Sequence, residues 1–249
     1  MRSHPQVLLM LDYDGTLVPL APRPEEARPS PRLLKLLSCL SQDLKRHVAV
    51  VSGRRVEELA DLLPLPYLFL AGLHGREVLH PAQDSRGSRL RLKLGPPGPP
   101  PGVWEEIQAH AERLATQVSG CWVEDKKEAI ALHFREADPK KAAQIVATFI
   151  RFTQPLVEAH QLEYLKGNKV IEVRIKGIHK GIAVEYFLKL FPHAFPIFLG
   201  DDLTDEDAFR MLKGRGLSVL VGEPRPTLAT YNLPTPAKVE DFLERLIRG

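Results

Sequence analysis

Short apolar runs that alternate with amphipathic segments constrain the fold of this chain more than any other feature. Among the 249 residues, apolar runs at 7–11 and 48–51 alternate with amphipathic stretches at 31–44 and 56–63. This order of strands and helices is typical of a parallel sheet whose faces are covered by helices. We therefore predict an α/β fold with a doubly wound, Rossmann-like core.

The amphipathic stretch at 31–44 shows the signals of a helix that faces the core. Ser30 is a suitable cap, and Pro31 suits the first turn. The apolar side chains recur at helical spacing, as Leu33, Leu36, Leu37, Leu40 and Leu44. A third strand is expected at 67–71, before Gly72.

The composition of the chain changes after Pro81. Residues 83–101 are rich in Gly, Ser, Arg and Pro, which indicates a loop or a short edge hairpin. A second unit is expected next, with a helix at 103–117, a hairpin at 121–135, a helix at 139–152 and a strand at 169–175. The first pattern then resumes, with a helix at 180–190, a strand at 196–199 and a helix at 239–248. We predict a core of residues 1–81 and 176–249, interrupted by an α+β cap at 82–175.

Charge and cysteine content exclude several classes of protein. The formal net charge is only +3, from 34 basic and 31 acidic side chains, so we expect no nucleic-acid partner. No apolar run approaches the roughly 20 residues of a membrane span. Cys39 and Cys121 lack metal-ligand spacing, and we expect buried free thiols. These features predict a soluble cytoplasmic protein, for which a monomer is compatible with the sequence.

Polar residues follow the predicted strands at the points where the strands end. Asp12 and Asp14 follow the first strand, Ser52 follows the second, and Asp201 and Asp202 follow the strand at 196–199; Lys180 begins a helix. Because ligands of open parallel sheets bind beyond the carboxyl ends of the strands, these residues are candidates for one site.

The two carboxylates at the end of the first strand point to metal-assisted phosphoryl chemistry. Asp12 and Asp14 are two residues apart on extended chain, so they face the same way and repel each other. Mg²⁺ prefers carboxylate oxygens, carbonyls, waters and a substrate phosphate, and Asp201 and Asp202 would complete its site. One carboxylate can then attack phosphorus while the other protonates the leaving oxygen. Lys180 and Ser52 would bind the same phosphate.

Some of these residues also have purely structural explanations. Ser52 and Thr204 could simply cap helices, Asp205 could be a favourable first-turn acid, and Lys180 alone could be a solvated surface lysine. Asp12 is different, because an acid directly after five apolar residues is costly unless a site uses it.

These residues resemble the four signatures of the haloacid dehalogenase superfamily of phosphotransferases. The signatures correspond in order to residues 12–16, Ser52, Lys180 and residues 200–205. The resemblance implies an aspartyl-phosphate intermediate on Asp12, with Asp14 as general acid and base. It also implies that Ser52 and Lys180 hold the phosphate, and that Mg²⁺ is bound by Asp12, the Asp14 carbonyl and Asp201, with Asp202 and Asp205 as supporting acids.

A narrower resemblance, to the trehalose-6-phosphate phosphatases, covers nearly the whole chain. It is carried by residues 51–54, 72–75, 123–126, 133–135, 169–174 and 200–207. It implies that the cap provides the disaccharide specificity and that the substrate-binding residues are Arg54, His74, Glu124, Lys126, His133, Lys169 and Glu172. From the residues alone, His74 could equally be a capping histidine. Alternation places His133 opposite to Ile130 and Leu132 across the strand.

Two positions depart from the pattern of this family, and other functions stay open. Ile175 stands where proline is usual, and Lys127 stands where a small turn residue is common, so we expect changes in the cap hinge and the hairpin turn. The alternative substrates are glucosylglycerate, mannosylglycerate and sucrose phosphates. A phosphomutase and a catalytically silent sugar-phosphate sensor are further alternatives.

Overall fold

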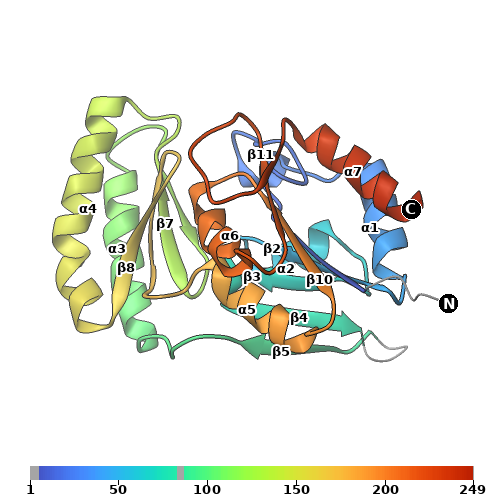
Figure 1. Ribbon diagram of the computed structural model, residues 1–249. Helices are drawn as coiled ribbons and strands as arrows, with labels where there is room; N and C mark the ends of the chain where they lie inside the picture. Colours follow the sequence, from blue (N-terminus) through green and yellow to red (C-terminus); the bar gives the residue numbers. More distant parts are fainter. Residues whose placement is uncertain (1–5, 83–86, 249) are drawn as a thin grey trace. The chain divides into compact units, whose positions relative to one another are not determined.

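The computed structural model describes residues 6–82 and 87–248 and divides the chain into two compact units. The first unit is Met1–Leu94 with His179–Gly249, and the second is Gly95–Ile178. An eight-stranded sheet runs through the first unit in the order β12-β11-β10-β1-β2-β3-β4-β5 (Figure 1). Its strands are β1 Val7–Leu11, β2 Arg46–Val51, β3 Phe69–Gly72, β4 Glu77–Ala82, β5 Arg89–Lys93, β10 Phe195–Gly200, β11 Leu217–Val221 and β12 Tyr231–Leu233.

The strands from β12 to β3 are parallel, and β1 lies between β10 and β2. The two remaining strands, β4 and β5, pair antiparallel at one edge. The predicted parallel core is therefore confirmed. Because neighbouring strands share one direction, the carboxyl ends of β1, β2 and β10 meet at one edge of the sheet.

Helices cover both faces of this sheet, as in a doubly wound fold. The helices α1 Pro31–Ser41, α2 Val56–Leu62 and α7 Pro236–Arg248 pack on one face, where Leu9 and Leu11 of β1 point. The helices α5 Lys180–Leu190 and α6 Glu206–Leu212 pack on the other face, with Leu8 and Met10. Alternate residues of β1 thus enter two separate hydrophobic clusters, and the central strand is buried on both sides. Single turns of 3₁₀ helix are η1 Pro24–Glu26, η2 Leu73–Gly75 and η3 Leu203–Asp205.

The predicted helix at 31–44 is shorter in the structure. Its start is as expected, because the Ser30 hydroxyl accepts a hydrogen bond of 3.0 Å from the Leu33 N–H. Its end is wrong, since α1 stops at Ser41 and Leu44 is 90% exposed. The Asp43 carboxylate accepts the Lys45 N–H in a local turn, which competes with another helical turn.

The second unit is a four-stranded antiparallel sheet with two helices. The sheet order is β6-β7-β9-β8, and Figure 1 shows α3 and α4 side by side. The elements are α3 Pro101–Ala115, β6 Trp122–Asp125, β7 Ala129–His133, α4 Pro139–Ala159, β8 Leu162–Gly167 and β9 Val170–Ile175. Tyr164 of β8 donates to the Ile150 carbonyl of α4 and bonds Thr153, which ties the helix to one face of the sheet. The helix predicted at 139–152 continues through Pro155 to Ala159.

The division between the units differs from the predicted boundaries at both ends. The second unit begins at Gly95 rather than at residue 82, because β5 pairs with β4 and extends the first sheet. It ends at Ile178 rather than at 175. The segment predicted as a loop or edge hairpin thus contains an edge strand, and its residues 83–86 lie outside the described residues.

The departures at Lys127 and Ile175 have local structural correlates. Lys127 lies in the turn between β6 and β7 with φ of 72°, a left-handed conformation that a small residue adopts more easily. Ile175 is the last residue of β9, and its side chain is buried. At position 175, a buried isoleucine side chain therefore takes the place of the proline that is usual in the family.

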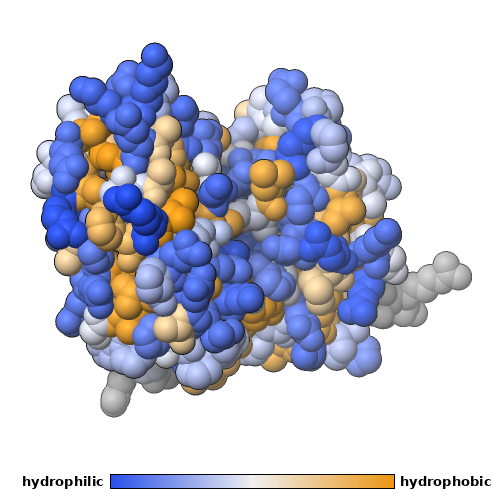
Figure 2. Space-filling model, turned by 90° about the vertical axis from the view of Figure 1, so that its left-hand side faces the viewer, coloured by the Kyte–Doolittle hydropathy of each residue, from blue (hydrophilic) through white to orange (hydrophobic). Residues whose placement is uncertain are grey.

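Surface features agree in part with the composition. Cys39 and Cys121 are free thiols, but Cys39 is exposed and Cys121 is half-buried, so the prediction that both are buried is wrong. Across the described helices, we find no segment with the length and apolar character of a membrane span. Hydrophobic side chains reach the surface in patches between hydrophilic ones on the face drawn in Figure 2.

Candidate active site

Three strand ends and one helix start of the first unit carry predicted catalytic and metal-binding residues. Asp12 follows β1, Ser52 follows β2, Asp201 follows β10, and Lys180 is the first residue of α5. Asp12 and Lys180 are each only 3% exposed. Because ionised groups at such depth need partners of opposite charge, their contacts decide what the site can do.

Lys180 joins two of the acids. Its ammonium donates hydrogen bonds of 2.6 Å to Oδ1 of Asp12 and to Oδ1 of Asp205. Although burial acts to lower the pKa of Lys180, the charges of Asp12 and Asp205 raise that pKa above its ordinary value. Lys180 is therefore a fixed positive charge beside Asp12, and its burial rules out the alternative of a solvated surface lysine.

Asp12, Asp201 and Asp205 form an acid group with the arrangement of a cation site. Each offers a carboxylate oxygen, and these oxygens lie within 4.8 Å of one another. When all three carboxylates are ionised, the single ammonium of Lys180 leaves an excess of two negative charges. Mg²⁺ would balance this excess, and oxygen ligands are those that it prefers.

Burial and mutual repulsion perturb all three acids. Burial raises the pKa of Asp12 to about 8 against the opposing effect of Lys180, and the charge of Asp201 adds to the rise. Burial followed by the charge of Asp205 raises the pKa of Asp201 to about 6. Burial also raises the pKa of Asp205 to about 7, although Lys180 opposes it. A bound divalent cation would favour the ionised form of each group.

These shifts predict a pH-dependent stability for the metal-free protein. An acid whose pKa is raised on folding binds more protons in the folded state, so stability falls as pH rises from about 4 through the folded-state pKa values of about 6, 7 and 8. We expect thermal unfolding in EDTA to show this loss, and added Mg²⁺ to stabilise the protein more at pH 8 than at pH 5. Equal stabilisation by Mg²⁺ at both pH values would contradict the placement of Mg²⁺ beside these acids.

Asp205 and Asp202 have the same predicted role, but they lie in different environments in the structure. Asp205 is 0% exposed, and its second oxygen accepts the Asp202 N–H at 3.0 Å. With its other oxygen on Lys180, Asp205 orients that lysine as well as contributing charge. Asp202 is exposed and lies outside the acid group, so its inclusion among the metal ligands is not supported.

Asp14 is held by Arg54 rather than by the acid group. Nε and Nη2 of Arg54 donate to the two carboxylate oxygens of Asp14, each at 2.7 Å, and Nη2 also donates to the Pro24 carbonyl. The guanidinium also lies over the Tyr13 ring, 5.1 Å from its centre. Arg54, expected as a substrate contact, thus orients the Asp14 carboxylate, which is one-third exposed.

Ser52 lies in the turn that follows β2, and His74 lies beside it in η2, which follows β3. The N-cap of α2 is Arg55, so Ser52 is not the cap of that helix; its hydroxyl accepts the Arg54 N–H at 3.2 Å. His74 donates its backbone N–H to the Ser52 carbonyl, and its ring is buried against Gly53. A Cβ on Gly53 would come within 2.7 Å of this ring. His74 therefore packs against the turn of Ser52 and Gly53 and holds it in place.

The second unit brings four of the five predicted cap residues together on the sheet face opposite to α4. Lys126 donates to Glu172 at 2.7 Å, and Glu124 is 2.9 Å from Nε2 of His133. The register supports this grouping, because Glu124 and Glu172 both pair with Ala131. Lys169 is exposed in the turn between β8 and β9, so the sheet face does not include it.

Comparison with known proteins identifies the family of this chain. Residues 10–237 match the trehalose-phosphatase family. The chain belongs to the trehalose-phosphatase family. Among relatives of this family, probable trehalose-phosphate phosphatase I of Arabidopsis thaliana is 33% identical, over 97% of this chain and 68% of that protein. Trehalose 6-phosphate phosphatase RA3 of Zea mays is 32% identical, over 97% of this chain and 70% of that protein.

Solved structures of the trehalose-phosphatase family share the fold. The C-terminal domain of trehalose-6-phosphate phosphatase from C. albicans is 28% identical, with a TM-score of 0.82 over 98% of this chain and 92% of that domain. A haloacid dehalogenase-like hydrolase from Bacteroides thetaiotaomicron shares the fold at 16% identity, with a TM-score of 0.67 over 97% of this chain and 99% of that one. The predicted fold is thereby confirmed.

Two residues that the sequence reasoning missed contact predicted members of the two sites. The Trp122 ring stacks on His133, with centres 3.8 Å apart and planes 2° from parallel. Trp122 lies two residues before Glu124 on β6, so strand alternation could have placed it on the same face. Arg225 donates to the backbone carbonyls of Asp201 and Asp202. No periodic signal marks this arginine, because it lies in a loop.

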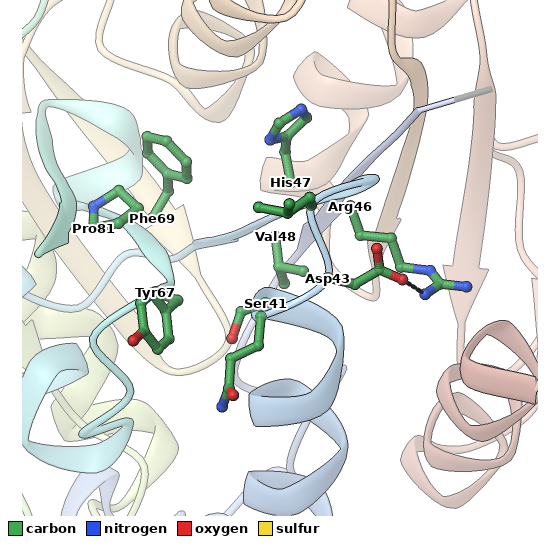
Figure 3. Close-up of a pocket in the computed structure, with 10 residues that line it drawn as sticks. Ser41, Asp43, Arg46, His47, Val48, Tyr67, Phe69 and Pro81 are labelled. Atoms are coloured by element: carbon green, nitrogen blue, oxygen red, sulfur yellow. Dashed lines mark hydrogen bonds and ion pairs between the residues drawn. The ribbon is translucent and has the colours of Figure 1, made fainter. Parts of the chain in front are cut away.

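A pocket of about 380 Å³ lies away from these acids, at the amino-terminal ends of β2 and β3. Figure 3 shows Tyr67, Phe69 and Pro81 on one side of it and Ser41 at the end of α1 on another. Asp43 pairs with Arg46 at its rim, which leaves no net charge there. Its position opposite to Asp12 along the strands separates it from the candidate active site.

Proposed function

We propose that the chain is a Mg²⁺-dependent phosphatase that hydrolyses trehalose 6-phosphate to trehalose and phosphate. The observation that carries this proposal is the close group of Asp12, Asp201 and Asp205 beside the buried Lys180, in a chain that belongs to the trehalose-phosphatase family. Asp12, Asp201 and the Asp14 carbonyl would hold Mg²⁺. When bound, the cation would neutralise charge on the acids and on the phosphate.

In the first step, a carboxylate oxygen of Asp12 forms a bond to phosphorus as the bond from phosphorus to the sugar oxygen breaks. Asp14 gives its proton to that leaving oxygen, and trehalose departs. Lys180, fixed on Asp12, stabilises negative charge on the transferring phosphoryl group. Ser52 lies at the same edge of the sheet, and its hydroxyl donates a hydrogen bond to a phosphate oxygen.

In the second step, water attacks phosphorus in the aspartyl phosphate. Asp14, now ionised, takes a proton from the water, and Asp12 leaves as a carboxylate with inorganic phosphate as product. Arg54 supports both steps, because its bidentate contact fixes the direction of the Asp14 carboxyl group. Asp14 therefore serves as the acid in the first step and as the base in the second.

The second unit, as cap, would select the sugar. Its sheet face presents two pairs, Lys126 with Glu172 and His133 with Glu124, whose polar groups can exchange these contacts for sugar hydroxyls. Buried donors and acceptors of this kind reject a ligand that leaves them unpaired. His74 and Arg54 act on the core side through the residues that they orient.

A comparison of substrates tests this function. With Mg²⁺, we expect kcat/KM for trehalose 6-phosphate to exceed those for sucrose, glucosylglycerate and mannosylglycerate phosphates by about 100-fold or more. Release of inorganic phosphate into water, without transfer to a second hydroxyl, is also expected. Comparable rates on all four substrates would refute the trehalose assignment, and the same reactions in EDTA are the control for metal dependence.

A further inference from the structure

We propose that Arg225 is a positioning residue that holds the loop of Asp201 and thereby strengthens the binding of a divalent cation by the acid group. This inference rests on the proposed function, because it assigns Asp201 to the metal. It concerns a residue of the loop between β11 and β12, outside the four catalytic signatures.

The contacts of Arg225 are directed at the backbone of the acidic loop. Nη2 donates to the Asp201 carbonyl at 3.3 Å and to the Asp202 carbonyl at 3.0 Å. These carbonyls belong to the segment that turns from β10 into η3. A guanidinium that bonds two successive carbonyls restricts the backbone on either side of the peptide that joins them.

Glu206 fixes Arg225 from the other side. Nη1 of Arg225 donates to Oε1 of Glu206 at 2.7 Å, and that carboxylate also accepts the Thr227 hydroxyl at 2.7 Å and the Leu228 N–H at 2.8 Å. The Arg225 side chain is 26% exposed and that of Glu206 is 17% exposed. The start of α6 and the loop after β11 are therefore tied together around this arginine.

The Asp201 side chain is confined by separate contacts. Thr16 donates to Oδ1 of Asp201 at 3.3 Å. Gly15 adopts a φ of 84°, and a Cβ there would lie 2.1 Å from Oδ2 of Asp201, so only glycine allows this approach. With the carboxylate confined from one side and its backbone held by Arg225 from the other, Asp201 stays directed at Asp12 and Asp205.

Geometry and charge predict opposite effects of removing Arg225. Loss of the loop contacts would weaken the metal site, since partners that orient metal ligands typically contribute about 10- to 100-fold in affinity. Loss of a positive charge would instead strengthen the binding of a cation. Arg225→Lys separates the two, because lysine keeps the charge but lacks the planar fork.

The test measures Mn²⁺ binding to the full chain by electron paramagnetic resonance, with Mn²⁺ as the probe for the magnesium site. We expect Arg225→Ala and Arg225→Lys each to raise the Kd for Mn²⁺ about 10-fold or more, with a matching rise in the Mg²⁺ concentration for half-maximal activity. Arg210→Ala is the matched control, because Arg210 is 63% exposed and pairs with Asp207 on α6. Its Kd should equal that of the wild type.

Thermal unfolding of each variant shows which of them are folded. If Arg225→Ala does not fold, the Kd for Mn²⁺ is measured on Arg225→Lys and Glu206→Gln instead. Each of these substitutions weakens the contacts that hold Arg225 and the Asp201 loop. A Kd for Mn²⁺ within about twofold of the wild-type value in the folded variants would overturn the role of Arg225 but not the proposed metal site. Failure of the wild type to bind Mn²⁺ would overturn the proposed metal site and this inference with it.

Discussion

Replacing Asp12 with Asn is expected to lower kcat/KM for trehalose 6-phosphate by about 10⁴-fold or more, because the amide is a poor nucleophile toward phosphorus. The fold should persist. Asn has nearly the same shape, and it removes a carboxylate whose pKa burial raises to about 8. We therefore expect the metal-free variant to unfold at a temperature equal to or above that of the metal-free wild type at pH 8. Phosphate release and thermal unfolding are the two measurements.

A matched control for this substitution is Asp61→Asn. Asp61 is exposed on α2, and its replacement should change neither activity nor stability measurably. Asp14→Asn provides a second comparison, because it removes the acid and base without removing the nucleophile. Substantial phosphate release by purified Asp12→Asn protein would rule out Asp12 as the nucleophile.

Replacing Lys180 with Met is expected to impair both stability and activity. Lys180 compensates two buried carboxylates, and removing one partner of a buried ion pair typically costs about 3 to 5 kcal/mol. The loss should be larger at pH 8 than at pH 5, because more of the remaining acids are ionised at the higher pH. Activity should fall by about 10²- to 10³-fold, as for other fixed charges at a transition state. Denaturant unfolding and steady-state kinetics measure the two effects.

Lys189→Met is the control on the same helix. The Lys189 side chain is 75% exposed and pairs with Glu185, so its loss should change the free energy of unfolding by less than about 1 kcal/mol. The double variant Lys180→Met with Asp205→Asn should recover part of the stability, since opposite charges are then removed together. Equal stability of Lys180→Met and Lys189→Met would show that Lys180 does not compensate these acids.

The strand ends of the site could be predicted because short-range patterns decide them. An acid after five apolar residues places Asp12 at the end of a buried strand, and the same logic places Ser52 and Asp201. The sequence pattern does not indicate which of the acids after β10 is buried, and the structure does. Asp202 and Asp205 are both acids of one short segment, and only the turn through η3 buries Asp205 and exposes Asp202.

Other features escaped prediction because their signals are weak or distant. The edge strand β5 alternates arginine and leucine inside a segment rich in proline and glycine, so it resembles a loop. The strand β12 has three residues, too few for a periodic signal. Arg225 reaches backbone atoms of Asp201 and Asp202, more than 20 positions earlier in the chain, and no local pattern reports such a contact.

The most direct test of the account is to find the phosphoryl group on the enzyme. Protein quenched in acid during turnover of trehalose 6-phosphate with Mg²⁺ would be reduced with borohydride, which converts an aspartyl phosphate to homoserine, and its peptides analysed by mass spectrometry. We predict homoserine at position 12 in these samples, and none when substrate or Mg²⁺ is left out. Modification at a different carboxylate, or none at position 12 in a sample that is releasing phosphate, would contradict the account.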